Sequence, residues 1–173
     1  MRVVAGVARG RRLEAPDGAD TRPTSDRVRE AIFNSLASMD ALEGAKVLDL
    51  FAGSGALGIE ALSRYAANCT FVERARPALD AIRTNLDSTG LSDRANIVVA
   101  DAMTFVTQGK AADFDLVLAD PPYDFSQWAE MLKGITTALV LAESNRPVAP
   151  PEGWEVRREK RYGKTWVTFL ERA

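Results

Sequence analysis

The chain has 173 residues, of which 46% are hydrophobic and 27% are charged, the composition of an ordinary soluble globular protein with a substantial core. It contains no histidine and a single cysteine, Cys69, so it lacks the commonest general base, an internal disulfide and the ligands of a transition-metal site. No apolar stretch approaches the roughly 18 residues of a membrane span, and residues 1–6 lack a signal-peptide core. We therefore expect a cytoplasmic protein without a membrane or metal partner.

The formal net charge of -2 is unevenly distributed along the chain. Residues 1–30 and 152–173 each carry a net charge of +2, whereas residues 31–151 carry -6. The basic residues of the two ends are clustered at positions 2–12 and 157–164. Such clusters suit a phosphate backbone, but either of them alone is also typical of a solvated strand face.

The N-terminal part predicts a short hairpin followed by a helix. Gly6 and Gly10 are turn residues between short apolar stretches within residues 2–14. Thr24 or Ser25 can cap a helix, because apolar side chains follow at helical spacing over residues 28–39.

After residue 45, predicted strands and helices alternate. Apolar runs predict strands, and helical spacing of apolar residues predicts helices between them. The expected fold class is α/β: a Rossmann-like, mostly parallel seven-stranded sheet with helices on both faces, an antiparallel C-terminal edge and a short N-terminal β-hairpin extension. The strands are expected at 46–51, 70–73, 96–100, 114–119, 139–142, 154–161 and 164–171, and the helices at 57–65, 77–88, 103–108 and 125–138.

Ligands bind such a sheet beyond the carboxyl ends of its strands. The first strand is followed by Gly53, Gly55 and Gly58, which have the spacing of a nucleotide-binding glycine turn. Glycine turns also serve only to pack a helix on a strand, so this motif is weak by itself.

Acids at the ends of four consecutive predicted strands strengthen the hypothesis of a site. One acid in such a place would be an ordinary cap or turn former, but four together are not. Glu73 lies twenty residues after Gly53, where a carboxylate can accept hydrogen bonds from ribose hydroxyls, and Asp101 can reach an adenine edge. The expected cofactor-binding residues are Asp49, Ala52, Gly53, Ser54, Gly55, Glu73, Arg74, Asp101 and Ala102.

Two cofactors fit a nucleoside pocket of this kind. A nicotinamide dinucleotide would place its pyrophosphate against the glycine turn, where the carboxylate of Asp49 is unfavourable. S-adenosylmethionine instead presents an ammonium group and a sulfonium cation, which acids stabilise. The charge pattern therefore favours S-adenosylmethionine, with Asp49 at its ammonium group.

The fourth acid begins the motif Asp120-Pro121-Pro122-Tyr123. The prolines end the strand and hold the chain rigid. The exocyclic amine of a nucleobase is a poor nucleophile, because its lone pair is delocalised into the ring. The Asp120 carboxylate and the Pro121 carbonyl could accept both N–H groups of such an amine, while Tyr123 offers a ring on which the base stacks.

These motifs resemble the bacterial 16S ribosomal RNA guanine-N2 methyltransferase family, which has the class I S-adenosylmethionine-dependent methyltransferase fold. The resemblance covers nearly the whole chain and rests on four blocks of sequence, of which the block at residues 21–36 is the most specific. The blocks are ArgGlyArgArgLeu at 9–13, residues 21–36 beginning ThrArgProThrSerAspArg, residues 47–61 around the glycine turn, and AlaAspProProTyr at 119–123.

The resemblance implies transfer of a methyl group to the N2 amine of one guanine in 16S ribosomal RNA, either as bare RNA or in a partly assembled small subunit. It implies catalytic roles for Asp120, Pro121, Pro122 and Tyr123. It also implies a basic, RNA-contacting N-terminal extension over residues 1–23, before a methyltransferase domain over 24–173. The expected substrate-binding residues are Arg9, Arg11, Arg22, Pro23, Thr24 and Arg27.

Other functions remain open on the residues alone. An adenine-N6 methyltransferase acting on DNA or RNA would share the glycine turn and the Asp-Pro-Pro-Tyr motif, although the DNA enzymes need a larger recognition segment. A nicotinamide-dependent oxidoreductase or a catalytically silent RNA-binding module would share only the fold.

Overall fold

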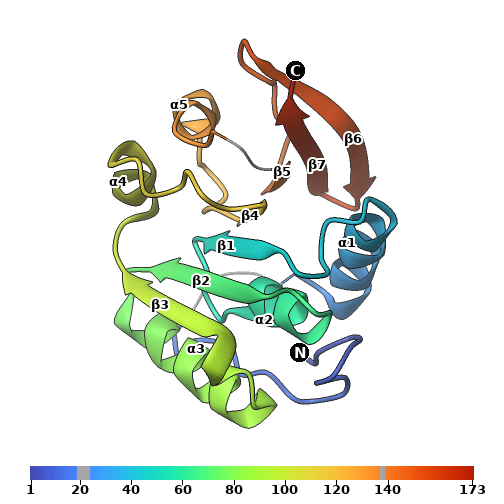
Figure 1. Cartoon of the computed structure of the whole chain (residues 1–173), viewed down its shortest axis with the longest axis vertical. Coiled ribbons are helices and arrows are strands. Elements are labelled where there is room, and N and C mark those ends of the chain that lie inside the picture. The colour runs from blue at the N-terminus through green and yellow to red at the C-terminus, as the bar shows by residue number, and fades with distance from the viewer. Residues whose placement is uncertain (19–23, 137–138) are drawn as a thin grey trace.

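The computed structural model describes residues 1–18, 24–136 and 139–173. Their core is one seven-stranded sheet with the strand order β3-β2-β1-β4-β5-β7-β6 (Figure 1). Five strands are parallel, and β7 runs antiparallel to both of its neighbours, as the sequence predicts. The strands are β1 (Lys46–Leu50), β2 (Asn68–Glu73), β3 (Ala95–Val99), β4 (Leu116–Ala119), β5 (Leu139–Ser144), β6 (Trp154–Tyr162) and β7 (Thr165–Arg172).

Helices cover both faces of the sheet. The first three pack their apolar side chains on one face, around Phe71, Leu118 and Phe169. The last two pack on the other face, against Val72 and Val117. The helices are α1 (Asp26–Ser38), α2 (Ala56–Ser63), α3 (Arg76–Thr89), α4 (Ala102–Thr107) and α5 (Trp128–Lys133), with a short 3-10 turn η1 (Ser92–Arg94).

Strand register determines which side chains meet at the carboxyl edge of the sheet. Asp49 pairs with Leu118, and Leu118 pairs with Leu141, so these three positions share one face. Two residues further along, and therefore on the same face, lie Asp120 and Glu143. Three acids from adjacent strands thus lie on the face that α1 and α2 cover.

The N-terminal segment packs into the same core as the sheet. Its expected hairpin is a chain reversal with a single antiparallel bridge, between Arg2 and Arg12. Val3 and Leu13 are buried against the face that carries α1 and α2. Residue 23, where the sequence places the boundary between extension and domain, lies outside the described residues, so this division stays a prediction.

The helix expected over 125–138 is shorter than predicted. Phe125 instead closes a turn, in which its N–H donates to the carbonyl of Pro122 at 2.9 Å. Helix α5 therefore begins at Trp128, and it ends before Gly134. A Cβ at Gly134 would lie 2.3 Å from Cγ1 of Val106, so this glycine permits the close approach of α5 to the end of α4.

We predict that Gly6→Ala destabilises the protein far more than Gly10→Ala. Both glycines have positive φ, +85° and +82°, so the conformational cost is similar. A Cβ at Gly6 would lie 1.9 Å from the carbonyl oxygen of Ser63, whereas nothing lies within 4 Å at Gly10. The free energy of unfolding, measured in urea, should fall by about 2 kcal/mol more for Gly6→Ala, and equal losses would contradict this packing of the extension on α2.

Candidate active site

The glycine turn is held by the two acids that flank it in the sheet. Asp49 is buried at the end of β1, and its Oδ2 accepts a hydrogen bond of 2.9 Å from the backbone N–H of Gly58 in the first turn of α2. Burial raises the pKa of Asp49 well above its usual value. Gly53 and Gly55 have φ of +58° and +80°, which a side chain would strain.

Glu73, at the end of β2, accepts three backbone hydrogen bonds. One carboxylate oxygen accepts from the N–H of Gly53 at 2.9 Å, and the other accepts from Arg74 at 2.9 Å and Ala75 at 3.0 Å. Glu73 therefore fixes the glycine turn to the neighbouring strand. A carboxylate has about four acceptor positions, so Glu73 has about one left for a ribose hydroxyl. This predicted contact stays a proposal.

Asp101 caps a helix, the role expected for at least one of the strand-end acids. Its Oδ1 accepts from the Thr104 N–H at 3.0 Å, and its Oδ2 lies 3.2 Å from Nη1 of Arg74. The backbone N–H of Thr104, with the nearby Arg74 guanidinium, lowers the pKa of Asp101. Asp101 is thus tied to α4, whose first residue is the buried Ala102.

The Asp120-Pro-Pro-Tyr motif lies at the solvent-exposed border of the site. Desolvation of its half-buried carboxyl raises the pKa of Asp120 to about 7. Pro121 is buried, whereas Pro122 is exposed and the Tyr123 side chain is 74% exposed. A ring so exposed beside a half-buried carboxyl can stack on a flat ligand without displacing any core residue.

Glu143, at the end of β5, is a site residue that the sequence did not identify. Its side chain is only 4% exposed, and its carboxylate accepts a hydrogen bond of 2.9 Å from the Thr24 hydroxyl. Burial raises the pKa of Glu143 above its usual value, and the negative charge of Asp120 raises it further. The rule that flagged the ends of the first four strands would have found Glu143 if applied to the fifth.

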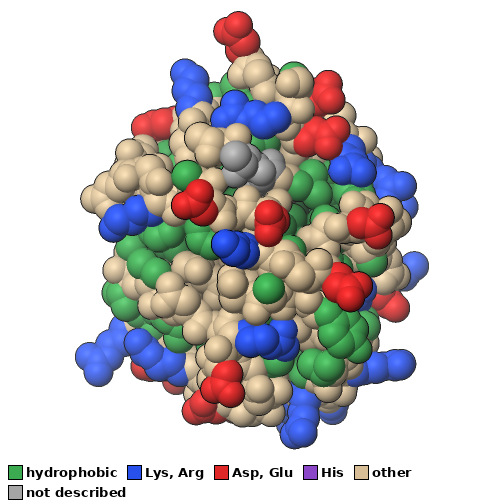
Figure 2. Space-filling view, in the orientation of Figure 1, with side chains coloured by type: hydrophobic (Ala, Val, Ile, Leu, Met, Phe, Trp, Pro, Cys, Tyr) green, Lys and Arg blue, Asp and Glu red, His purple; other side chains and the backbone are tan. Residues whose placement is uncertain are grey.

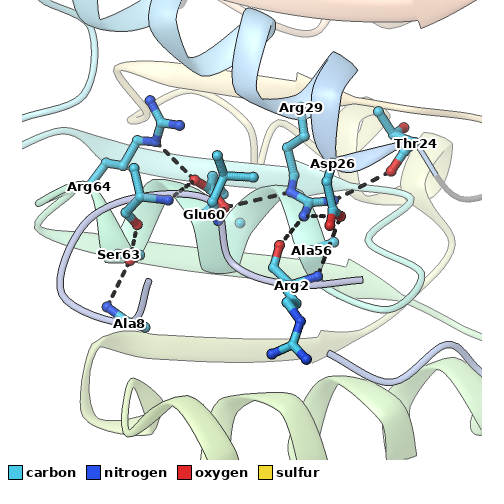
Figure 3. A network of polar contacts seen from close by, with 12 residues as sticks. Arg2, Ala8, Thr24, Asp26, Arg29, Ala56, Glu60, Ser63 and Arg64 are labelled. Atoms are coloured by element: carbon cyan, nitrogen blue, oxygen red, sulfur yellow. Dashed lines mark hydrogen bonds and ion pairs between the residues drawn. The ribbon is translucent and has the colours of Figure 1, made fainter. Parts of the chain in front are cut away.

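A buried ion pair holds the N-terminal segment and two helices together (Figure 3). The Arg29 side chain, on α1, is fully buried, with Nε 3.6 Å from Oε2 of Glu60 on α2. The same guanidinium donates to the carbonyl of Arg2 and to Oδ1 of Asp26. Glu60 in turn accepts from the backbone N–H of Val4 at 2.9 Å.

Asn85, on α3, links the N-terminal segment to the glycine turn. It exchanges two hydrogen bonds with the backbone of Glu14, at 2.8 and 2.9 Å, and also donates to the carbonyl of Ser54 at 2.9 Å. Aromatic contacts join the same turn to the Asp-Pro-Pro-Tyr loop, because the Phe51 and Phe125 ring centroids lie 5.3 Å apart. Neither contact has a signature in the sequence.

Four of the predicted substrate-binding residues lie in the described part of the chain, two at the start of α1 and two on the N-terminal segment. Thr24 faces Glu143 through its hydroxyl, and Arg27 is exposed in the first turn of α1. Arg9 and Arg11 are exposed on the N-terminal segment, Arg9 close to the end of α2 that lies away from the glycine turn. Arg22 and Pro23 lie outside the described residues.

Comparison with known proteins identifies the class and then the family. Rossmann-like topology with an antiparallel C-terminal edge, a glycine turn after β1 and Asp-Pro-Pro-Tyr after β4 define a class I methyltransferase fold. The family model described as Conserved hypothetical protein 95 matches residues 1–171, and the chain belongs to this family.

Relatives of known name agree with this membership. The chain is 38% identical to Ribosomal RNA small subunit methyltransferase D of Escherichia coli strain K12, over 99% of this chain and 90% of that protein. The solved structure of the E. coli yhhF protein superposes with a TM-score of 0.85 at 37% identity, covering 99% of this chain and 97% of that one. The structure of a hypothetical protein from Thermus thermophilus gives a TM-score of 0.81 at 29% identity, covering 98% of each chain. The family resemblance drawn from the sequence is confirmed.

Two properties of the described residues bear on membranes and metal ions. Among these residues, no helix is long and apolar enough to cross a membrane. No cluster of three or more His, Cys, Asp or Glu side chains suited to a metal ion occurs in residues 1–18, 24–136 and 139–173.

We predict that Asp120→Asn stabilises the protein at neutral and alkaline pH. In the folded wild type Asp120 holds its proton up to about pH 7, whereas in the unfolded chain it ionises near its ordinary value of 3.8. The unfolded state therefore binds fewer protons between these limits, and stability falls as pH rises through them. Asn cannot ionise, so the Asp120→Asn variant does not lose stability in this way.

The gain should grow from none near pH 4 to about 1–4 kcal/mol above pH 7, measured as the free energy of unfolding in urea across this range. Asp124→Asn, on an exposed side chain four residues along, is the control and should show no such pH-dependent gain. A gain that is the same at pH 4 and pH 8 would contradict a raised pKa at Asp120.

Proposed function

We propose that this protein transfers a methyl group from S-adenosylmethionine to the exocyclic N2 amine of one guanine in 16S ribosomal RNA of the small subunit. The observation that carries the proposal is the meeting of Asp120 with Asp49 and Glu143 at the carboxyl edge of the sheet, beside the glycine turn and the exposed Tyr123. A relative at 38% identity bears the name of a small-subunit ribosomal RNA methyltransferase, which supports the class of substrate.

The residues at the glycine turn fit S-adenosylmethionine. At Gly53 the nearest atom to an added Cβ is the carbonyl oxygen of Phe51, 4.0 Å away, so the turn faces open space into which a ligand can approach the backbone. The acids nearby, Asp49 and Glu73, suit the ammonium group and the ribose hydroxyls. When bound there, S-adenosylmethionine supplies a methyl group attached to a positively charged sulfur.

A nicotinamide cofactor fits the same site less well. Its pyrophosphate would lie close to Asp49, Asp120 and Glu143, and the nearest buried cation, Arg29, is already engaged with Glu60 and Asp26. A pyrophosphate there would oppose the ionisation of these carboxyl groups still further, and any of them that did ionise would repel it in a poorly hydrated site. The charge of the site therefore favours a cationic cofactor.

The Asp120-Pro-Pro-Tyr motif supplies what the amine needs. The Asp120 carboxylate and the Pro121 carbonyl accept hydrogen bonds from the two N–H groups, which localises the nitrogen lone pair and aims it away from the ring. Tyr123 stacks on the base, an interaction worth roughly 1–3 kcal/mol per base. These groups orient the amine as well as activate it.

Asp120 also suits the proton that the reaction must release. As the nitrogen–carbon bond forms and the carbon–sulfur bond breaks, the amine nitrogen carries one proton too many. A carboxylate hydrogen-bonded to it, with a pKa of about 7, accepts that proton at neutral pH. The released proton then passes to solvent when the product leaves.

The rest of the proposal concerns the residues that bind RNA, the form of the RNA substrate and the cellular location. Arg27, which is exposed at the start of α1, is proposed to contact RNA, and Arg9, Arg11, Arg22, Pro23 and Thr24 complete the proposed substrate-binding set. An RNA within a partly assembled small subunit and a cytoplasmic location are part of the same proposal.

We predict that Asp120→Ala abolishes methyl transfer but weakens cofactor binding only modestly. The substitution removes the acceptor for the amine, but the glycine turn, Asp49 and Glu73 remain. Transfer of labelled methyl to 16S ribosomal RNA followed by nucleoside analysis measures the first effect, and calorimetry with S-adenosylmethionine measures the second. Label in N2-methylguanosine is expected from the wild type.

Asp124→Ala is the matched control, since Asp124 is exposed and lies beyond Tyr123. A DNA duplex and NADH test the alternative functions in the same assays. An active Asp120→Ala variant would contradict the mechanism, whereas label in N6-methyladenosine would contradict the proposed base.

A further inference from the structure

Three cations at the turn between β6 and β7 have no acidic partner among the residues that the structure describes. Lys160, Arg161 and Lys164, here named the hairpin rim, are all exposed. In the part of the chain that the structure describes, none of them forms an ion pair, whereas Arg64, Arg74, Arg83 and Arg157 do. The hairpin rim therefore presents three uncompensated positive charges within five residues.

Aromatic rings and the backbone hold two of these side chains in place. The guanidinium carbon of Arg161 lies 5.6 Å from the Trp166 ring centroid, and its Nε donates to the carbonyl of Gly163 at 2.8 Å. The Nζ of Lys160 lies 5.8 Å from the Tyr162 ring centroid. These contacts order the side chains without neutralising them, which lowers the entropy cost of binding an anion.

Strand register places the hairpin rim at the same edge of the sheet as the catalytic motif. Lys160 pairs with Val167, which pairs with Glu143, and Glu143 lies beside Asp120 at the end of the adjacent strand. Three strand spacings separate Lys160 from Asp120, about 14 Å along the sheet. Nucleotides that flank a base held at Asp120 can reach this distance.

The first turn of α1 lies near the site, because it follows Thr24, whose hydroxyl donates to Glu143 at 2.9 Å. Arg158 of β6 donates to the hydroxyl of Ser35 at 3.2 Å, so α1 packs beside this strand, as Figure 1 also shows. Arg27, at the other end of α1, is exposed and also unpaired among the described residues. On the face shown in Figure 2, basic and acidic side chains are interspersed, so an RNA-binding surface on this acidic protein depends on local groups of cations.

We propose that the hairpin rim binds the phosphates of the RNA that flanks the target nucleotide. The proposal rests on the proposed function for its substrate and adds a docking surface, formed by the C-terminal hairpin, to that site. RNA is favoured because phosphates complement charges that have no carboxylate partner, and because the rim lies at the catalytic edge. The competing explanation is that lysine and arginine merely keep the edge strand β6 from pairing with another chain.

The test compares RNA affinity in two triple variants that each remove three positive charges. The rim variant is Lys160→Gln with Arg161→Gln and Lys164→Gln. The control removes three exposed cations from α3, from the end of α5 and from the loop after α4, by Arg83→Gln, Lys133→Gln and Lys110→Gln. Fluorescence anisotropy with a labelled fragment of 16S ribosomal RNA is recorded over a series of salt concentrations.

The expected result is a salt dependence shallower by about two units of log K per log salt in the rim variant, because each lost phosphate contact to single-stranded RNA removes about 0.7. The control variant should keep the wild-type slope. Binding of S-adenosylmethionine, measured by calorimetry, should be unchanged in both.

Other outcomes overturn the proposal in different ways. Equal slopes in the rim variant and the wild type, or equal losses in both variants, would show that the rim does not contact phosphates. Self-association of the rim variant with an unchanged slope would favour protection of the edge strand instead. A wild type that does not bind RNA at all would overturn the proposed substrate as well as the hairpin rim. This result differs from RNA binding with an unchanged slope, which would overturn the hairpin rim alone.

Discussion

Three carboxyl groups that lie together at the carboxyl ends of β1, β4 and β5 are the constraint on which the site depends. Removing a carboxylate from water is costly, so each is either hydrogen-bonded or holds its proton more tightly. Asp49 accepts from an amide of α2, Glu143 accepts from Thr24, and Asp120 has a pKa of about 7. Three carboxyl groups so close together stabilise an incoming cation, and one with a pKa near 7 can accept a proton. Methyl transfer from a sulfonium to an amine requires both.

The rest of the core keeps these acids where they are. Arg29 and Glu60 form a buried pair between α1 and α2, and the backbone of the N-terminal segment completes their hydrogen bonds. A buried pair of this kind contributes little net stability, but removal of either partner would leave an unpaired charge in the core. The pair therefore fixes the position of α1, which follows Thr24 and carries Arg27 in its first turn, relative to the strands that carry the acids.

The sequence predicted the fold because its signals are local and agree with one another. Apolar runs, glycine turns and the prolines after Asp120 each identify an element or its end, and the sheet is mostly parallel with an antiparallel C-terminal edge, as predicted. The predicted start of α5 was wrong, because the turn at Phe125 depends on a single backbone hydrogen bond that leaves no pattern.

Contacts between distant segments could not be predicted. The sequence indicates that Asp101 and Glu73 end strands, but not that Asp101 caps α4 or that Glu73 binds the amide of Gly53. The contacts of Asn85 with Glu14 and of Glu143 with Thr24 join residues more than 70 positions apart along the chain, and no sequence pattern indicates them. The substrate class is proposed from the names of relatives, because no property of the residues alone determines it.

The most direct measurement is the titration of the Asp120 carboxyl carbon by NMR, assigned by comparison with Asp120→Asn, in the free protein and with two ligands. S-adenosylmethionine carries a positive sulfur, whereas S-adenosylhomocysteine lacks both the charge and the methyl group. We expect a midpoint near pH 7 in the free protein, a clear decrease with S-adenosylmethionine and a smaller decrease with S-adenosylhomocysteine. A midpoint near 4 in the free protein, or equal shifts with the two ligands, would contradict the central role of a desolvated carboxyl that faces a cation.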